Sequence, residues 1–227
     1  MSYESTIVKK PWGYEYLAYE NAHVAIWFLH IMYTHSTSLH CHPKKTTGLI
    51  LLDGKAEVSF FNHTNTLSPG NKVMIRKGLF HSTKAVSEKG AMVFEMETPV
   101  DKHDLVRFRD SYGREGKPYE DSTFEYPKAE ECLWITNPAK DSENVYDYAN
   151  CTLLVRSITN IKALLNVDDT VNVMFLQGGL QTNYDQNVAG PGDIVSASVL
   201  KQLTSVFTKV DPETVVMIVK QKTSNNE

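Results

Sequence analysis

The sequence predicts an all-β protein built as a sandwich or a barrel. Its apolar residues recur at strand-like spacing, in short runs rich in β-branched and aromatic side chains. Gly, Pro, Asn or Asp bounds most of these runs, so turn signals follow about every 8 to 12 residues. Few segments carry the 3.6-residue period of an amphipathic helix.

The first half contains five such runs, each of which predicts one strand. They span 22–32, 47–54, 55–62, 71–78 and 90–97. Asp53-Gly54 stands between the second and third runs and predicts a hairpin turn there. Residues 101–131 are charged, interrupted by Gly and Pro, and poor in aliphatic side chains, which is typical of a surface linker.

The β pattern resumes after this segment. The expected strands span 150–159, 169–184, 191–199 and 213–220, and short helices are expected over 157–166 and 195–203.

The two β regions resemble an internal repeat. Pro-Gly precedes an apolar run at Gly70 and again at Gly192, and Gly54 matches Gly178 at a similar offset. These anchors predict two related barrels, over 1–120 and 121–227. His81 then corresponds to Leu203, so we expect any metal ligands to lie in the first barrel alone.

Three histidines in the first half form a candidate metal site. His40 and His42 alternate on a strand and therefore point to one face, and His81 restarts a strand after a Gly turn. In a small closed barrel, inward positions of neighbouring strands converge, so His81 can complete the set. Neutral imidazoles bind divalent transition metals such as Zn, Fe, Mn or Ni.

These residues resemble the two motifs of the cupin superfamily. The first motif is matched by His40, His42 and Gly54, with Thr47 where the family has glutamate. The second is matched by Gly70, Gly78 and His81, with Arg76 in place of proline. The resemblance implies a cupin β-barrel, or jelly roll, and a bicupin whose second barrel is degenerate.

A narrower resemblance covers residues 9–120. KPWGYEY (10–16) and DLVRFRDSYGR (104–114) are similar to the segments that flank the barrel of type II mannose-6-phosphate isomerases and related sugar-nucleotide cupins. It implies a phosphorylated or nucleotide-linked sugar as ligand, and an isomerase or epimerase activity. Thr47 and Gly48 replace the family's Glu and His, so the group that moves the proton must come from elsewhere.

Candidate catalytic and substrate-binding residues surround these motifs. Glu95 and Glu97 share a face of the last strand and, if inward, offer a base or a fourth metal ligand; outward, they are solvated charges. Lys45, Arg76 and Arg107 are candidate contacts for an anionic ligand. Tyr14 either stacks on a sugar or covers a barrel end.

Three functions remain open from the sequence. They are a metal-dependent sugar isomerase or epimerase, a three-His iron dioxygenase, and a non-catalytic sugar-binding or scaffold protein. The net charge of −4 does not indicate nucleic-acid binding, and no apolar run is long enough for a membrane-spanning helix. Three unpaired cysteines fit a reducing compartment, so we expect a cytoplasmic protein. An exposed barrel edge is expected to be covered either by a second copy in a homodimer or by the second barrel of the same chain.

Overall fold

The computed structural model describes residues 6–117, 127, 129–165 and 167–222. The chain divides into two compact units, Met1–Trp134 and Ile135–Glu227. The division therefore lies between residues 134 and 135, beyond the boundary expected after residue 120. No helix among the described residues is long and apolar enough to cross a membrane.

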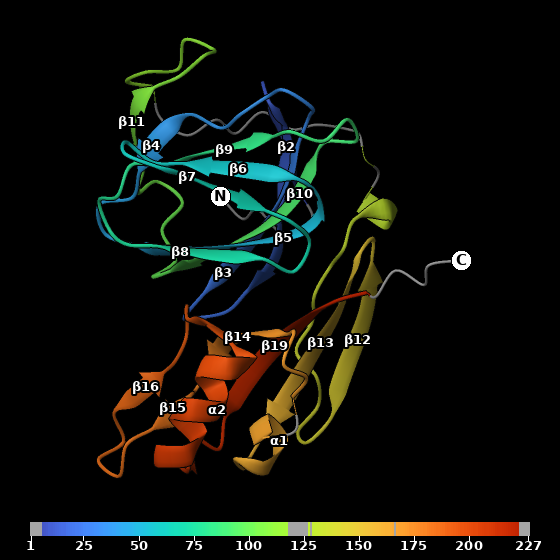
Figure 1. Ribbon diagram of the computed structural model, residues 1–227, viewed down its shortest axis with the longest axis vertical. Helices are drawn as coiled ribbons and strands as arrows, with labels where there is room; N and C mark the ends of the chain where they lie inside the picture. The colour runs from blue at the N-terminus through green and yellow to red at the C-terminus, as the bar shows by residue number, and fades with distance from the viewer. Residues whose placement is uncertain (1–5, 118–126, 128, 166, 223–227) are drawn as a thin grey trace. The chain divides into compact units, whose positions relative to one another are not determined.

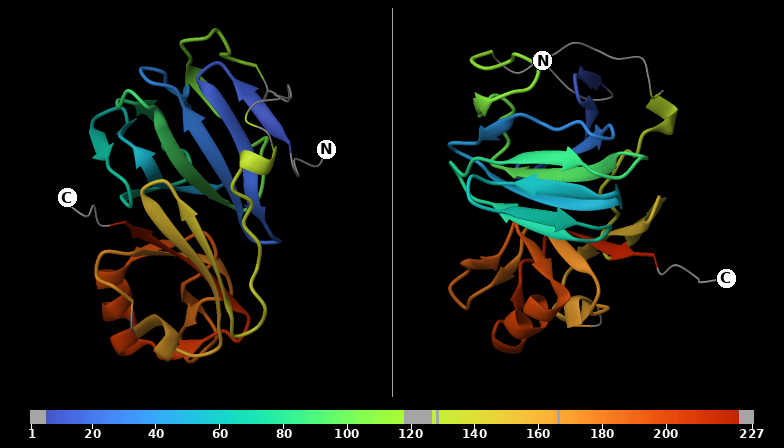
Figure 2. Two further views of the ribbon diagram at one scale, coloured as in Figure 1. Left: turned by 90° about the vertical axis from the view of Figure 1, so that its right-hand side faces the viewer. Right: turned by 45° about the horizontal axis from the view of Figure 1, so that its top comes forward.

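The strands of the first unit form two layers of antiparallel sheet (Figures 1 and 2). The larger sheet has the order β1 (Ile7–Lys10), β2 (Gly13–Glu20), β3 (Ala25–Ile31), β10 (Ala91–Thr98), β5 (Thr46–Gly54) and β8 (Lys72–Ile75). The smaller sheet has the order β7 (Thr64–Leu67), β6 (Ala56–Ser59) and β9 (Ser82–Ala85). From β5 to β10 the chain passes back and forth between the two sheets, which confirms the predicted jelly-roll barrel.

A third, two-stranded sheet carries part of the candidate site. It pairs β4 (Leu39–Cys41) with β11 (Val106–Arg109). An isolated antiparallel bridge between His40 and His81 links β4 to the residue before β9. Residues 101–131 are thus more than a linker, because they supply β11 and the 3₁₀ turn Ala129–Glu131.

The hairpin expected at Asp53-Gly54 is not formed. β5 pairs with β10 and β8, whereas β6 pairs with β7 and β9, so the chain changes sheet at Gly54. Gly54 has φ +80°, and a Cβ there would lie 2.1 Å from the carbonyl oxygen of Gly90. Glycine is therefore required by a close crossing of two segments that are distant in sequence.

The core of the first unit lies between its two sheets. Leu49 and Leu51 of β5, Val93 of β10 and Val58 of β6 belong to one buried apolar cluster. Since alternate residues of a strand share a face, the row that contains Val93 continues through Glu95 and Glu97 into the barrel.

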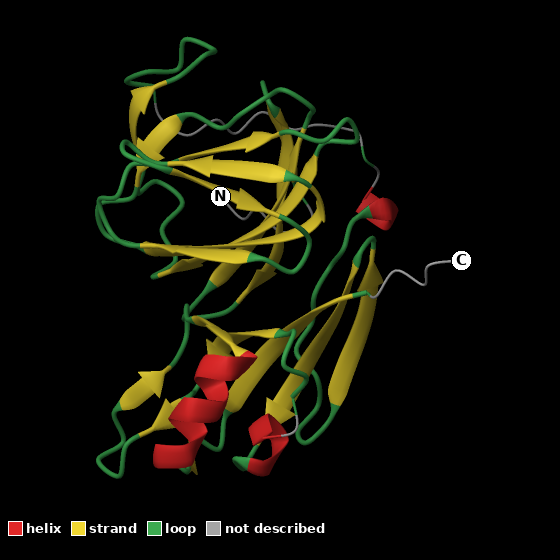
Figure 3. Ribbon diagram, in the orientation of Figure 1, coloured by secondary structure: helices red, strands yellow, loops and turns green. Residues whose placement is uncertain are grey.

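Among the described residues, the two helices of more than three residues belong to the second unit (Figure 3). Its five-stranded sheet has the order β12 (Glu143–Tyr148), β13 (Cys151–Ile158), β19 (Thr214–Gln221), β14 (Asn172–Gln177) and β17 (Ile194–Ser196). A three-stranded sheet has the order β16 (Asn187–Ala189), β15 (Leu180–Gln181) and β18 (Lys209–Val210). The helices are α1 (Lys162–Leu165), shorter than expected because β13 extends to Ile158, and α2 (Ala197–Val206).

The internal repeat is visible in backbone hydrogen bonds. The amide of Gly70 donates to the carbonyl of Leu51 at 2.8 Å, and the amide of Gly192 donates to that of Phe175 at 3.0 Å. The central strands also correspond, because β10–β5–β8 matches β19–β14–β17. Leu203, the counterpart of His81, lies in α2, so a helix stands where the first unit has the strand that follows its third histidine.

Candidate metal centre

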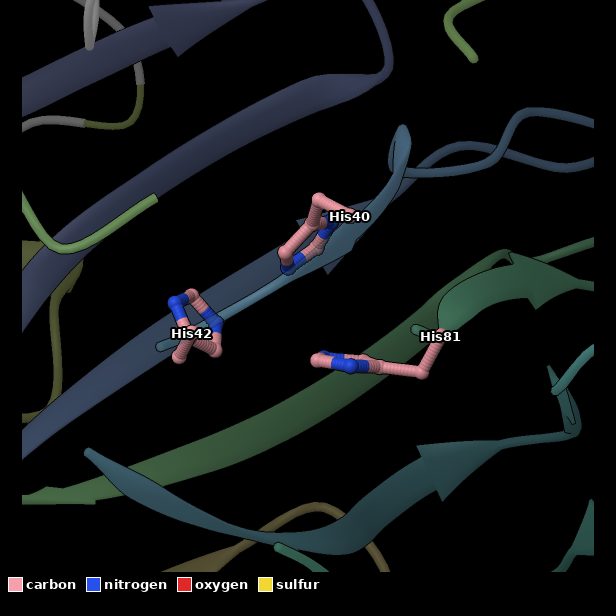
Figure 4. Close-up of side chains that lie close together, drawn as sticks. All are labelled: His40, His42 and His81. Atoms are coloured by element: carbon pink, nitrogen blue, oxygen red, sulfur yellow. The ribbon is translucent and has the colours of Figure 1, made fainter. Parts of the chain in front are cut away.

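Three buried histidines meet inside the first unit. His40 belongs to β4, His42 follows that strand, and His81 precedes β9. Their ligand atoms all lie within 4.8 Å of one another, and all three residues are buried. Figure 4 shows the three rings gathered about a common point. The structure thus brings together the three ligands predicted from the sequence.

Backbone carbonyls hold the ring orientation of all three histidines. The Nδ1 atoms of His40, His42 and His81 lie 2.8, 2.6 and 3.0 Å from the carbonyl oxygens of Ser38, Asp104 and Leu79. A carbonyl only accepts, so each Nδ1 carries the proton and donates it. In the neutral form of such a ring Nε2 keeps a lone pair, which is the arrangement that metal-binding histidines require.

The protonation state of the rings also suits a metal. Burial lowers the pKa of His81 to about 4, against a hydrogen bond to Leu79 that raises it. Burial likewise holds the pKa of His40 well below its usual range, with His81 and His42 adding to the effect. Both rings are therefore neutral near pH 7. The buried Nε2 of His42 has no hydrogen-bond partner among the described residues, as expected of an atom reserved for a ligand.

Glu95 adds a carboxylate to this group. It points inward from β10, and its Oε1 lies 3.7 Å from the Nε2 of His42, beyond hydrogen-bond range. Burial raises the pKa of Glu95, but His42, Lys102 and Lys45 outweigh that effect and hold the pKa below its ordinary value. An ionised carboxylate therefore faces the three imidazoles, in the inward orientation that one of the two sequence alternatives required.

Glu97 is also inward but is already engaged. It forms an ion pair with Lys45, and both side chains are almost wholly buried. Its other oxygen accepts a hydrogen bond from the indole nitrogen of Trp27 at 3.3 Å. Glu97 does not line the cavity beside the histidines. This arrangement favours a supporting role for Glu97 over the catalytic role that the sequence predicted.

Thr47 occupies the position where the resembling family has glutamate. It is buried on β5, directly opposite Glu97 in the pairing of β5 with β10. Its hydroxyl has no hydrogen-bond partner within the described part of the chain. A carboxylate of β10, that of Glu95, instead lies 3.7 Å from the Nε2 of His42.

A cavity opens beside the histidines and is rich in positive charge. Its wall includes His40, His42 and Glu95. One further acid, Glu15, lines the cavity. Five cationic side chains also line it: Lys10, Lys45, Lys102, Arg107 and Arg114. Four of the five cations form ion pairs with carboxylates: Lys10 and Lys102 with Glu15, Lys45 with Glu97, and Arg114 with Asp110. Counting these partners and Glu95 leaves five cations against four carboxylates, an excess of one positive charge, which favours an anionic ligand.

The predicted substrate-binding residues separate into two pairs. Lys45 and Arg107 line the cavity. Arg76 is exposed in the loop after β8 and does not line it. Tyr14 lies outside the cavity wall as well and stacks on His30, with ring centroids 4.8 Å apart. The first pair therefore lies at the cavity and the second pair lies outside its wall.

Sequence reasoning missed several of the cavity's charged residues, among them Lys102 and Glu15. Lys102 lies 2.8 Å from Glu15 and sits over the ring of Trp27, 3.4 Å from its centroid. Lys102 falls in the charged segment interpreted as a linker, and Glu15 lies among aromatic residues. Glu15 lies within the KPWGYEY segment, but neither that segment nor any spacing indicates that Glu15 and Lys102 meet, because the fold brings them together.

Comparison with known proteins gives structural likeness only. No family model matches the chain, and no curated relative matches it. KdgF from Halomonas sp. is similar at 15% identity over 44% of this chain and 94% of its own, with a TM-score of 0.40. CapF, a capsular polysaccharide assembling protein from Staphylococcus aureus, is similar at 14% identity over 46% of this chain and 34% of its own, with a TM-score of 0.42.

A candidate sugar phosphate isomerase from Acidithiobacillus ferrooxidans is similar at 18% identity. That likeness covers 37% of this chain and 56% of the other, with a TM-score of 0.34. Each of the three similarities thus spans less than half of this chain, and the site is interpreted from its own geometry.

Proposed function

We propose that this protein binds one divalent transition metal ion at His40, His42 and His81 and acts on a small anionic sugar, such as a sugar phosphate or a nucleotide-linked sugar. The reaction class is isomerisation or epimerisation. The observation that carries this proposal is the convergence of three buried, carbonyl-anchored imidazoles beside a cavity lined by five cationic side chains.

The donor set suits such a metal. Three imidazole nitrogens bind Zn, Fe, Mn or Ni and leave coordination positions for water or substrate. When bound, the metal would supply Lewis acidity that polarises a carbonyl or a pair of hydroxyl groups.

The protein's own side chains would carry out the remaining steps. Glu95 lines the cavity next to His42 and is ionised near neutral pH; its position, rather than its lowered pKa, makes it the candidate to accept a proton from a carbon of the bound sugar. Lys45, Lys102 and Arg107 can hold the anionic group, Lys as a point charge and Arg through its planar fork.

One alternative has an observation in its favour. A non-catalytic sugar-binding protein would need the same cavity and no proton acceptor, and Glu97 is already neutralised by Lys45. The iron dioxygenase alternative rested on three histidines without a carboxylate. Glu95, at 3.7 Å from the Nε2 of His42, supplies one.

The decisive experiment measures metal content, ligand binding and proton exchange on one preparation. Elemental analysis should give near one equivalent of transition metal, which His40→Ala/His81→Ala should lose. Sugar phosphates and nucleotide sugars are then screened by thermal shift, and the ones that bind are incubated in D₂O. Deuterium incorporation at a sugar carbon supports the isomerase or epimerase, and binding without incorporation supports the binding protein. Absence of metal from the wild type contradicts the proposal.

A further inference from the structure

Asp104 contacts the segment after β4 through two separate groups. Its carboxylate oxygen Oδ2 accepts hydrogen bonds from the backbone amides of Lys44 and Lys45, at 2.8 and 2.9 Å. Its carbonyl oxygen accepts the hydrogen bond from Nδ1 of His42, at 2.6 Å. One buried residue of the turn before β11 therefore holds both a metal-ligand candidate and the backbone that follows it.

This anchoring distinguishes His42 from the other two histidines. The carbonyls that hold His40 and His81 belong to Ser38 and Leu79, each two residues away in sequence. The carbonyl that holds His42 is 62 residues away. The orientation of His42 therefore depends on how the turn that contains Asp104 is seated against the segment after β4.

Lys45 depends on the same turn. Its backbone amide is held by the Asp104 carboxylate, and its Nζ donates to the carbonyl of Asp101 at 3.1 Å. Glu97 completes the surroundings of the Lys45 ammonium group. The turn from Asp101 to Asp104 thus fixes both a ligand candidate for the metal and a cation of the adjoining cavity.

We infer that Asp104 is a positioning residue that seats His42 and Lys45 together, so that the metal centre and the anion-binding wall form as one unit. The inference rests on the proposed function, since it concerns the same centre. Removal of the carboxylate would leave two backbone amides without their acceptor. The segment after β4 would then shift, and the carbonyl of Asp104 would no longer meet the ring of His42.

The test measures Zn²⁺ and Co²⁺ affinity by chelator competition in the full-length protein. Asp104→Ala should weaken both affinities by roughly 10- to 100-fold, the usual effect of losing a residue that orients a ligand. Asp104→Asn, which retains one acceptor oxygen, should weaken them less. The control is Asp169→Asn, because Asp169 is an exposed carboxylate of the second unit that pairs with Lys201; its affinity should equal that of the wild type.

A double-mutant cycle separates positioning from general destabilisation. If Asp104 acts through His42, Asp104→Ala should cost little further affinity in a His42→Ala background. An equal loss in both backgrounds would overturn the inference, as would a single variant with wild-type affinity. A wild type that binds no metal would overturn the proposed function and this inference together, whereas a metal-binding wild type with an unaffected variant overturns the inference alone.

Discussion

The Nε2 atom of His42 and the Oε1 atom of Glu95 lie 3.7 Å apart inside the first unit. This separation allows Glu95 to act as a fourth metal ligand or as a proton acceptor beside the metal, and Glu95→Gln distinguishes the two. A proton acceptor predicts unchanged metal content with turnover reduced by roughly 100-fold or more. A ligand predicts loss of metal affinity. Full turnover with full metal content would exclude both roles.

The low pKa values of the histidines predict acid sensitivity of the metal-free protein. Because the folded-state pKa of His81 is about 4 and that of His40 is also lowered, the unfolded state binds more protons below its own histidine pKa of about 6.5. Stability is therefore fully present above pH 6.5 and falls as the pH drops toward 4, by up to about 1.4 kcal/mol per pH unit for each histidine.

Urea unfolding with a chelator, at pH 7.5 and at pH 5.0, measures this dependence. His81→Gln removes one of the titrating groups and should make the stability less dependent on pH between these values. If the free energy of unfolding of the variant changed with pH as steeply as that of the wild type, the pKa of His81 would not be lowered by folding.

The buried ion pair between Lys45 and Glu97 predicts strong coupling. Glu97→Gln leaves a buried ammonium group without its counter-ion, and we expect a loss of about 3–5 kcal/mol in the free energy of unfolding. Lys45→Met/Glu97→Gln should lose less than the two single variants combined, because both charges are absent. If denaturant unfolding showed that the double variant loses as much stability as the two single variants combined, Lys45 and Glu97 would not be energetically coupled.

Two arginines that the sequence grouped together should behave differently. Arg107 lines the cavity, whereas Arg76 is exposed outside its wall. Arg107→Gln should weaken binding of a sugar phosphate by roughly tenfold, the equivalent of one charge-assisted hydrogen bond. Arg76→Gln is the control and should bind like the wild type in calorimetric titration. If both variants weakened sugar-phosphate binding equally, the anionic group would not bind at Arg107.

Alanine substitutions at two glycines distinguish the cost of steric crowding from the cost of backbone strain. Gly54 and Gly78 both have positive φ, at +80° and +72°. A Cβ at Gly78 meets no heavy atom within 4 Å among the described residues, so Gly78→Ala should cost roughly 1–2 kcal/mol from strain alone. Gly54→Ala adds the clash with the carbonyl of Gly90 and should cost more. Equal losses in thermal unfolding would mean that the crossing can relax.

The sequence by itself determined the features that depend on local spacing. The period of two along the runs gave the all-β fold, and the same period placed His40 and His42 on one face. The repeated Pro-Gly and Gly anchors identified two related halves. The absence of histidine after residue 103 confined the three-His site to the first half.

Only the tertiary structure decided what surrounds the three histidines. Glu95 and Lys102 line the cavity beside two of them, and Asp104 holds His42, although no motif indicated these contacts. Thr47 stands where the resembling family has glutamate, and a carboxylate of another strand lies near the histidines instead. Arg76 and Tyr14 lie near the motifs in sequence yet outside the cavity wall. Local pattern fixes which face of a strand a side chain occupies, but strand order and the crossings between sheets fix which side chains share a cavity.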